Sequence, residues 1–172
     1  MSFLKLAAER YSVRKYSQKP VEREKIDLIL KAAQLAPTAV NYQPQMIYIL
    51  TGAEALRTIR SLTNATYNAP LVFLLCADEN RTWKSPMEKG YTTGEMDVSI
   101  VCTHMMLEAW ELGLGSVWVR LFDAREVAKA FNLPSNLKPV CLLPVGYAAP
   151  DSVPYAPWHN VFRPIEEFCR EL

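Results

Sequence analysis

The sequence predicts an α+β fold with a small central sheet, and three observations support this prediction. Short apolar runs rich in β-branched and aromatic residues, typical of strands, are interspersed with segments of helical periodicity. The two kinds of segment do not alternate regularly and no phosphate loop joins them, so a doubly wound nucleotide-binding fold is disfavoured. The length of 172 residues matches one domain. We therefore expect a single domain over residues 1–172.

Strands are expected where short apolar runs lie beside Gly or Pro. Residues 46–50 (MIYIL) and 71–77 (LVFLLCA) fit this description, since they lie close to Gly52 and Pro70. Two further runs complete the set of expected strands, at 116–119 and 140–147.

Helices are expected from apolar spacing and from capping residues. Ile26, Ile29 and Ala33 follow the i, i+3, i+7 spacing of one buried face, in a helix that begins near Val21 and ends before Pro37. The proline-rich tail is expected to be mostly extended. Other helices are expected after Ser2, over 53–62, from Asp123 through Phe131, and from Pro164.

The longest expected helix covers residues 95–112. Gly113 follows it, at the position where a left-handed cap requires a residue without Cβ. Apolar residues spread widely around its axis, so we expect a central helix that is buried on most sides and can also face a second subunit.

Composition excludes several classes of protein. Nineteen Lys and Arg against 18 Asp and Glu give a formal net charge of +1, so no overall field attracts nucleic acid or an anionic membrane. The longest apolar run, 69–77, contains Pro70 and is far shorter than the about 20 residues of a membrane-spanning helix. The apolar stretch at the N-terminus is too short for a signal peptide, so a cytoplasmic protein is expected.

The common catalytic and metal-binding motifs are missing. GLGSVW (113–118) lacks the third glycine of the dinucleotide fingerprint and follows a helix rather than a strand. GxxxxGK[ST], GxSxG and HExxH are absent, and the four cysteines lie far apart without a CxxC pair. We therefore expect no metal and no disulfide framework, and these motifs supply no candidate catalytic side chain.

RYSVRKY (10–16) is open to two interpretations. In an extended segment, Arg10, Ser12 and Arg14 point the same way, and two guanidinium groups with a hydroxyl can bind a phosphate. The alternative is a solvated basic turn, because short basic clusters are common on protein surfaces.

A second polar stretch, APTAVNYQP (36–44), separates a helix from a strand. The side chains of Asn41 and Gln43 offer both donors and acceptors, which suits the edge of a planar heterocycle. The alternative interpretation is that these polar residues only form the loop between the helix and the strand.

Taken in order, these pieces resemble the FMN-dependent nitroreductase family. The matching elements are an R-x-S-x-R opening, a helix ending in AP-[ST]-A-x-N-x-QP, a long central helix with GLGSVW, and a late PVGY strand. The resemblance covers nearly the whole chain. It implies a three-layer α+β fold, with helices flanking a small and mostly antiparallel sheet, and an extensive homodimer with FMN at the shared interface.

The resemblance also implies roles for particular residues. Arg10 and Ser12, with the backbone near Tyr11, would hold the FMN phosphate and ribityl chain, and Arg14 would lie near the N1/O2 edge of the ring. The partner chain would supply Pro37, Thr38, Ala39, Asn41 and Gln43. Backbone contacts along the ring would come from Val117, Trp118, Val119, Arg120 and Leu121. Arg163 would help to neutralise the phosphate, and His159 or Asn160 would replace a second basic residue that some members carry beside it.

The chemistry implied is a ping-pong exchange through flavin N5. NADH or NADPH gives a hydride and leaves, and a nitroaromatic, a quinone or a similar small-molecule acceptor takes its place. Residues 78–94 form the obvious variable loop, where Trp83 or Tyr91 would stack on a substrate or simply anchor the loop. Two other functions stay open: a non-enzymatic protein that stores or delivers FMN, and a specialised branch that cleaves flavin or removes halogen.

Overall fold

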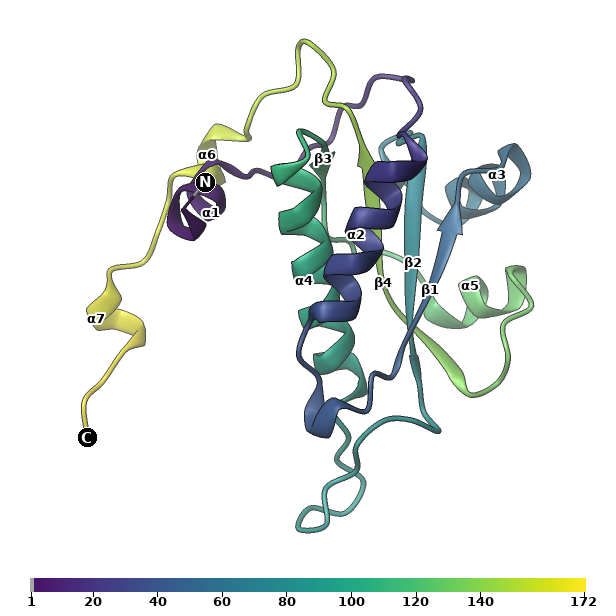
Figure 1. Cartoon of the computed structure of the whole chain (residues 1–172), viewed down its shortest axis with the longest axis vertical. Coiled ribbons are helices and arrows are strands. Elements are labelled where there is room, and N and C mark those ends of the chain that lie inside the picture. Colours follow the sequence, from purple (N-terminus) through teal and green to yellow (C-terminus); the bar gives the residue numbers. More distant parts are fainter. Residues whose placement is uncertain (1) are drawn as a thin grey trace.

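The structure, a computed structural model, describes residues 2–172 and contains one four-stranded sheet (Figure 1). The strand order is β1-β2-β4-β3, and each neighbouring pair is antiparallel. This confirms the expected small, mostly antiparallel sheet. The strands are β1 (Gln45–Leu50), β2 (Leu71–Asp78), β3 (Gly115–Ser116) and β4 (Leu137–Gly146).

The strand expected over 116–119 is shorter in the structure, and Pro144 explains why. Val117 donates its N–H to the carbonyl of Pro144 over 3.3 Å, but proline has no N–H to return the bond. The regular ladder therefore stops after Ser116. It resumes as an isolated bridge in which Val119 and Leu142 exchange both hydrogen bonds at 2.9 Å.

The helices agree with the sequence prediction in number and place, apart from one added turn in the tail. The prediction missed α6, a single turn in the proline-rich segment. The bounds are α1 (Phe3–Glu9), α2 (Arg23–Leu35), α3 (Ala53–Leu62), α4 (Gly94–Glu111), α5 (Ala124–Ala130), α6 (Ala156–His159) and α7 (Ile165–Phe168), with 3-10 turns η1 (Ala39–Asn41) and η2 (Asn64–Thr66).

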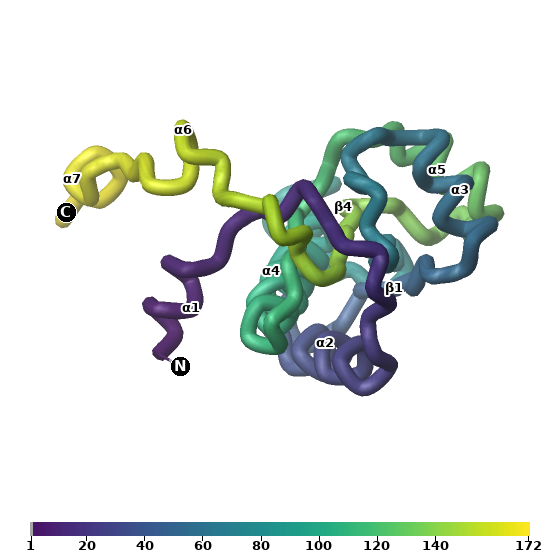
Figure 2. Tube along the Cα trace, turned by 90° about the horizontal axis from the view of Figure 1, so that it is seen from above, coloured from purple at the N-terminus to yellow at the C-terminus, as the bar shows by residue number. Residues whose placement is uncertain are grey.

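Helices cover both faces of the sheet and give three layers (Figure 2). Helices α2 and α4 pack on one face, where Phe73 of β2 and Leu143 of β4 are fully buried. Helices α3 and α5 pack on the other face, against Leu74 and Leu142. Neighbouring residues of a strand thus point into opposite layers, as the strand periodicity requires.

Helix α4 ends as the sequence predicts. Gly113 has φ +75°, its N–H donates to Trp110 O, and the N–H of Leu114 donates to Ala109 O. These two bonds form a Schellman motif, which a residue with a Cβ would strain. In the single chain, however, α4 is buried mainly on one side, because Met96 stays 52% exposed and Ile100 and Leu107 are partly exposed.

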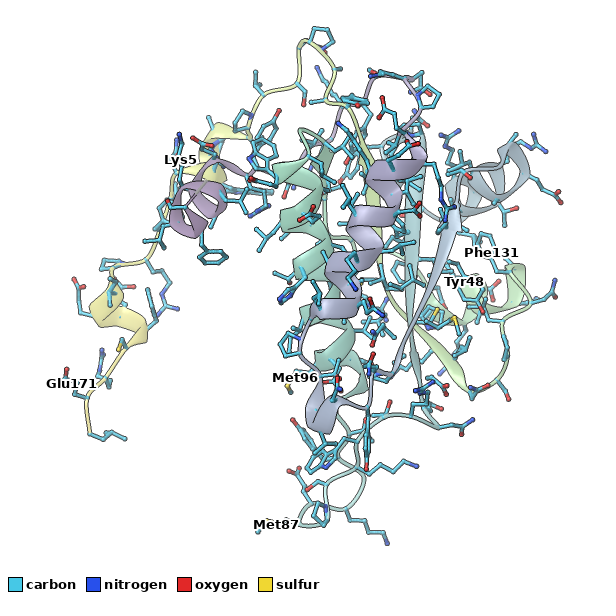
Figure 3. The ribbon with its side chains drawn as sticks, in the orientation of Figure 1. Lys5, Tyr48, Met87, Met96, Phe131 and Glu171 are labelled. Carbon is cyan, nitrogen blue, oxygen red and sulfur yellow. The ribbon has the colours of Figure 1, made fainter. Side chains whose placement is uncertain are left out.

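The residues after Ser152 leave the body of the protein (Figure 2). We call residues 153–172 the C-terminal arm; it carries α6 and α7, and Glu171 near its end lies far from the sheet (Figure 3). None of its residues belongs to either buried cluster. Its exposed apolar side chains are Val153, Tyr155, Trp158, Val161, Phe162, Ile165, Phe168 and Leu172.

A carboxylate at the start of α2 makes the stability of the fold pH-dependent. The hydroxyl of Tyr147 donates to Glu22 over 2.7 Å, and Lys19 lies 3.0 Å from the other carboxylate oxygen. The Tyr147 bond, then backbone and Lys19 interactions, lower the pKa of Glu22 to about 2.

Since the folded pKa lies below the unfolded one, the unfolded chain binds the extra proton between about pH 4.5 and pH 2. The contribution of Glu22 to the free energy of unfolding is therefore present above this window and lost as the pH falls through it. We expect Glu22→Gln to flatten the acid limb of a stability-against-pH curve, measured by urea unfolding. The exposed neighbour Glu24→Gln is the control, and an unchanged acid limb in Glu22→Gln would remove Glu22 from this role.

Candidate functional site

Residues 10–14 form an extended segment beside the edge strand β3. Ser12 makes a parallel bridge with Ser116, and Val13 donates its N–H to Ser116 O over 3.0 Å. Val13 is fully buried. Because successive residues of an extended segment point to opposite sides, Ser12 and Arg14 face outward. Arg10, Ser12 and Arg14 all line one cavity of about 240 Å³, as the alternation in the sequence predicts.

Arg10 is the unusual member of this cavity. Its side chain is half-buried, and among residues 2–172 its guanidinium has no ion pair and no hydrogen bond. Burial lowers the pKa of Arg10 from its ordinary value. A half-buried cation without a partner is costly, and a bound anion removes that cost. The cavity is therefore built to accept a negatively charged group.

Aromatic side chains form the other walls of the cavity, and apart from His159 the sequence analysis did not single them out. They are Tyr155, Trp158, His159 and Phe162, from the first half of the C-terminal arm. The His159 and Tyr11 rings meet edge to face with centroids 6.1 Å apart, and Tyr11 donates to Ser152 O over 3.2 Å. The available signal was the density of aromatic residues in the proline-rich tail.

The segment 117–121 lies next to residues 10–14, since both adjoin β3. Val117 and Val119 point inward and are buried, whereas Trp118 and Leu121 are exposed. The Leu121 carbonyl accepts a hydrogen bond of 2.6 Å from Thr63. Arg120 folds back on the chain, with its guanidinium 4.8 Å from the Phe122 ring centre and donating to Phe122 O. The structure thus brings two of the predicted site segments together.

The segment with Pro37, Thr38, Ala39, Asn41 and Gln43 lies at the opposite end of the sheet. The segment leads into β1, whose first residue Gln45 pairs with Ala77 of β2, and Ala77 pairs in turn with Lys138 near the start of β4. Residues 10–14 instead lie beside β3, which pairs with the other end of β4 at Gly146. Eight residue steps of about 3.3 Å separate Lys138 from Gly146, which is about 26 Å. One chain therefore does not bring this segment to the cavity of Arg10.

Arg163 also lies apart from that cavity in the single chain. Its side chain is exposed, 3.3 Å from the carboxylate of Glu167. His159 lines the cavity, whereas Asn160 and Arg163 do not. A phosphate contact of Arg163 therefore stays a prediction from the resemblance.

A second hollow of about 560 Å³ lies at the base of the loop between β2 and α4, whose tip carries Met87 (Figure 3). Tyr91 and Met96 line it together with the basic residues Lys84 and Lys138. Trp83 is half-buried and does not line the hollow, and its carbonyl accepts the N–H of Thr93 over 3.2 Å.

Three of the four cysteines are buried, and Cys169 is exposed. Cys76, Cys102 and Cys141 are buried, and desolvation raises the pKa of Cys76 to about 12. Residues 2–172 contain no cluster of His, Cys, Asp or Glu that could hold a metal ion. Among the same residues, no helix combines the length and apolarity needed to cross a membrane.

Close packing at Gly115 keeps the Arg10 segment against the sheet. A Cβ at Gly115 would lie 2.4–2.9 Å from three side-chain atoms of Val13, so one of the two strands must move. We expect Gly115→Ala to lower the free energy of unfolding by about 1–3 kcal/mol, measured by chemical denaturation. Gly52→Ala is the matched control, because a Cβ there meets no atom within 4 Å. Equal stability of the two variants would contradict the packing argument.

Comparison with known proteins identifies the wider group. The model of the Nitroreductase family matches residues 7–67 and 60–147. A crystal structure of a nitroreductase family protein from Clostridium difficile 630 superposes with a TM-score of 0.91 at 38% identity, covering 99% of this chain and 98% of that one.

Two curated relatives carry more specific names. An iodotyrosine deiodinase from Thermotoga neapolitana is 31% identical, with 83% of this chain and 86% of that protein covered. An FMN reductase [NAD(P)H] from Bacillus subtilis is 27% identical, with 85% and 66% covered. The fold, the order of the motifs and the match to the family model agree with one another, and the chain belongs to the nitroreductase family.

Proposed function

We propose that the protein is an FMN-dependent NAD(P)H:acceptor oxidoreductase. The observation that carries this proposal is the unpaired, half-buried Arg10 in a cavity shared with Ser12 and Arg14, in a chain of nitroreductase fold. The FMN reductase [NAD(P)H] among the relatives supports the choice of both cofactor and reductant. Acceptors are small oxidants such as nitroaromatics or quinones.

The residues present fit FMN. Arg10 and Ser12 would hold the phosphate, with His159 as a neighbouring donor and Tyr11 as a wall. Arg14 is exposed at the mouth of the cavity and would place a positive charge near the ring. The backbone of residues 117–121 would run along the ring edge, as the resemblance implies.

The bound flavin supplies the hydride chemistry, so the tasks of the chain are to bind, orient and shield it. Arg10 offsets the phosphate charge and fixes one end of the cofactor. A cation at Arg14 favours an anionic reduced ring over a neutral one, because it stabilises the added negative charge. Aromatic side chains of the arm would form one wall at the phosphate end.

We propose that the working form is a homodimer with FMN at the shared interface. The predicted site segments 10–14 and 37–43 lie at opposite ends of the sheet, so one flavin contacts both only if a second chain contributes one of them. The exposed apolar side chains of the arm and the uncovered side of α4 supply the surface that such a dimer needs.

We further propose that residues 1–172 act as one domain and that the protein works in the cytoplasm. Two buried clusters share a single sheet, which supports one cooperative unit. The absence of a membrane-spanning helix among residues 2–172 agrees with this proposal.

The absorption spectrum of the purified protein tests the proposed function. We expect visible flavin bands that bleach under anaerobic conditions when NADH or NADPH is added and return when a quinone is added. A flavin that stays oxidised would favour the carrier that stores or delivers FMN. A protein that binds no added FMN would overturn the proposal.

The iodotyrosine deiodinase among the relatives keeps a dehalogenating branch as a second candidate. Its discriminating substrate is a halogenated tyrosine, offered to the dithionite-reduced protein. We expect no halide release above that from free reduced FMN. Release at a rate well above that of free FMN would favour the dehalogenating branch.

A further inference from the structure

Asp97 is a buried carboxylate in the first turn of α4. It is only 3% exposed, and among residues 2–172 no Lys, Arg or His forms an ion pair with it. Its Oδ1 accepts the backbone N–H of Ala39 over 2.9 Å, and its Oδ2 accepts the hydroxyl of Thr93 over 2.7 Å. Each carboxylate oxygen thus binds a donor from a different segment, so Asp97 fixes the position of those two segments relative to α4.

The turn that contains Ala39 has a strained backbone. Val40, Asn41 and Gln43 have φ values of 46°, 56° and 51°, and a left-handed conformation is strained for a β-branched residue such as Val40. Thr38 accepts the Gln43 N–H over 3.0 Å, which closes the turn internally. Asp97 supplies a side-chain bond from outside the turn, and it does so at the residue that precedes the strained positions.

The second partner of Asp97 belongs to the base of the loop between β2 and α4. Thr93 is buried, donates its N–H to Trp83 O, and accepts the N–H of Asp97 at its own carbonyl over 2.7 Å. The carboxylate therefore joins the strained turn to the base of the loop that lines the hollow of Tyr91 and Lys84.

We propose that Asp97 is a positioning residue that fixes the turn 38–43 in the conformation that completes the flavin site of the partner subunit. This inference rests on the proposed function, because the turn reaches a flavin only across the dimer. Asp97 acts through its hydrogen bonds, because its two carboxylate oxygens set the position of Ala39 relative to α4. Asp97 itself touches no cofactor.

Two variants at position 97 separate hydrogen-bonding from charge. In Asp97→Asn the amide oxygen still accepts from Ala39, while the amide nitrogen donates to a rotated Thr93 hydroxyl. In Asp97→Leu the volume is similar, but the partly buried Ala39 N–H loses its acceptor. We expect the FMN dissociation constant to rise at least about 10-fold in Asp97→Leu, and to stay within about 3-fold of wild type in Asp97→Asn. Asp27→Asn, an exposed change on α2, is the control for loss of one charge.

Hydrogen exchange of the apoprotein supplies a readout independent of FMN. We expect faster exchange in residues 38–43 of Asp97→Leu, with unchanged protection in β2 and β4. If Asp97→Leu does not fold, Thr93→Val replaces it as the test, since it removes only the hydroxyl donor, and Thr93→Ser should restore the wild-type values.

Mixed dimers test whether Asp97 acts across the interface. One chain carries Arg10→Ala and the other carries Asp97→Leu, with different affinity tags for purification of the mixed species. If Asp97 serves the partner's site, the site that lacks Arg10 is also the one whose turn 38–43 comes from the Asp97→Leu chain. The other site then has Arg10 from one chain and an unaltered turn from the other. We expect one tightly bound FMN per mixed dimer and none in either homodimer.

The outcomes distinguish this inference from the proposed function. Mixed dimers without a tight site would mean that Asp97 serves its own chain's Arg10 cavity, which overturns the inference. Wild-type affinity for FMN and unchanged exchange in Asp97→Leu would also overturn it, with the proposed function intact. A wild-type protein that binds no FMN, or binds it as a monomer, would overturn the shared-site proposal and this inference with it.

Discussion

Replacement of Arg10 by alanine is expected to release most of the FMN from the purified protein. A charge-assisted hydrogen bond contributes about 1.5–3 kcal/mol, so the FMN dissociation constant should rise about 10- to 100-fold. The effect is expected to be large because Arg10 is half-buried and has no protein partner to share its charge. Titration of the apoprotein with FMN, followed by quenching of flavin fluorescence, measures it directly.

Two further arginine variants calibrate this result. Arg14→Ala should weaken binding less, because Arg14 is exposed and its charge is screened by water. Arg57→Ala should leave binding unchanged, since Arg57 is exposed on α3, on the other face of the sheet. Normal FMN occupancy in Arg10→Ala would place the phosphate site elsewhere in the protein.

Removal of the C-terminal arm is expected to give a folded monomer that no longer binds FMN. A chain that ends at Ser152 keeps both buried clusters, because no residue of the arm belongs to either. It loses eight exposed apolar side chains, each contributing about 1.5 kcal/mol or more when fully buried. Burial of only three of them against a partner would account for a change of at least about 1,000-fold in the dimer dissociation constant.

Light scattering during size-exclusion chromatography measures the mass of the truncated chain, and circular dichroism verifies its fold. A milder pair of variants separates loss of the arm from loss of its apolar surface. Trp158→Ser with Phe162→Ser should weaken the dimer, whereas Met87→Ser should not, although Met87 is 96% exposed at the tip of its loop. A truncated chain that stays dimeric would show that the arm is not the main interface.

Local sequence signals were sufficient for most of the secondary structure and for the shared orientation of Arg10, Ser12 and Arg14. Apolar runs identified all four strands, although the third covers only Gly115–Ser116, and apolar spacing together with capping residues identified the helices of the body. The alternation of Arg10, Ser12 and Arg14 was confirmed because an extended segment has a period of two whatever it packs against. Gly113 could be recognised as a helix cap for a similar reason, since its conformation depends on the adjacent turn alone.

Other features depend on contacts between residues far apart in the sequence, and only the tertiary structure decided them. The third strand stops at Ser116 because Pro144, on another strand, has no N–H to give. The arm's aromatic residues become walls of a cavity because Tyr11 and Lys15 fasten the base of the arm at Ser152 and Asp151. No local periodicity encodes such pairings.

The sequence by itself thus determined the fold class, the elements and the chemical character of each polar segment. Only the tertiary structure decided that residues 10–14 and 37–43 lie at opposite ends of one sheet, and that Asp97 holds the second of them. The physical reason is that element type follows from the spacing of nearby residues, whereas the separation of two segments follows from strand register and chain direction. These are set by hydrophobic burial and hydrogen bonds that form only in the folded chain.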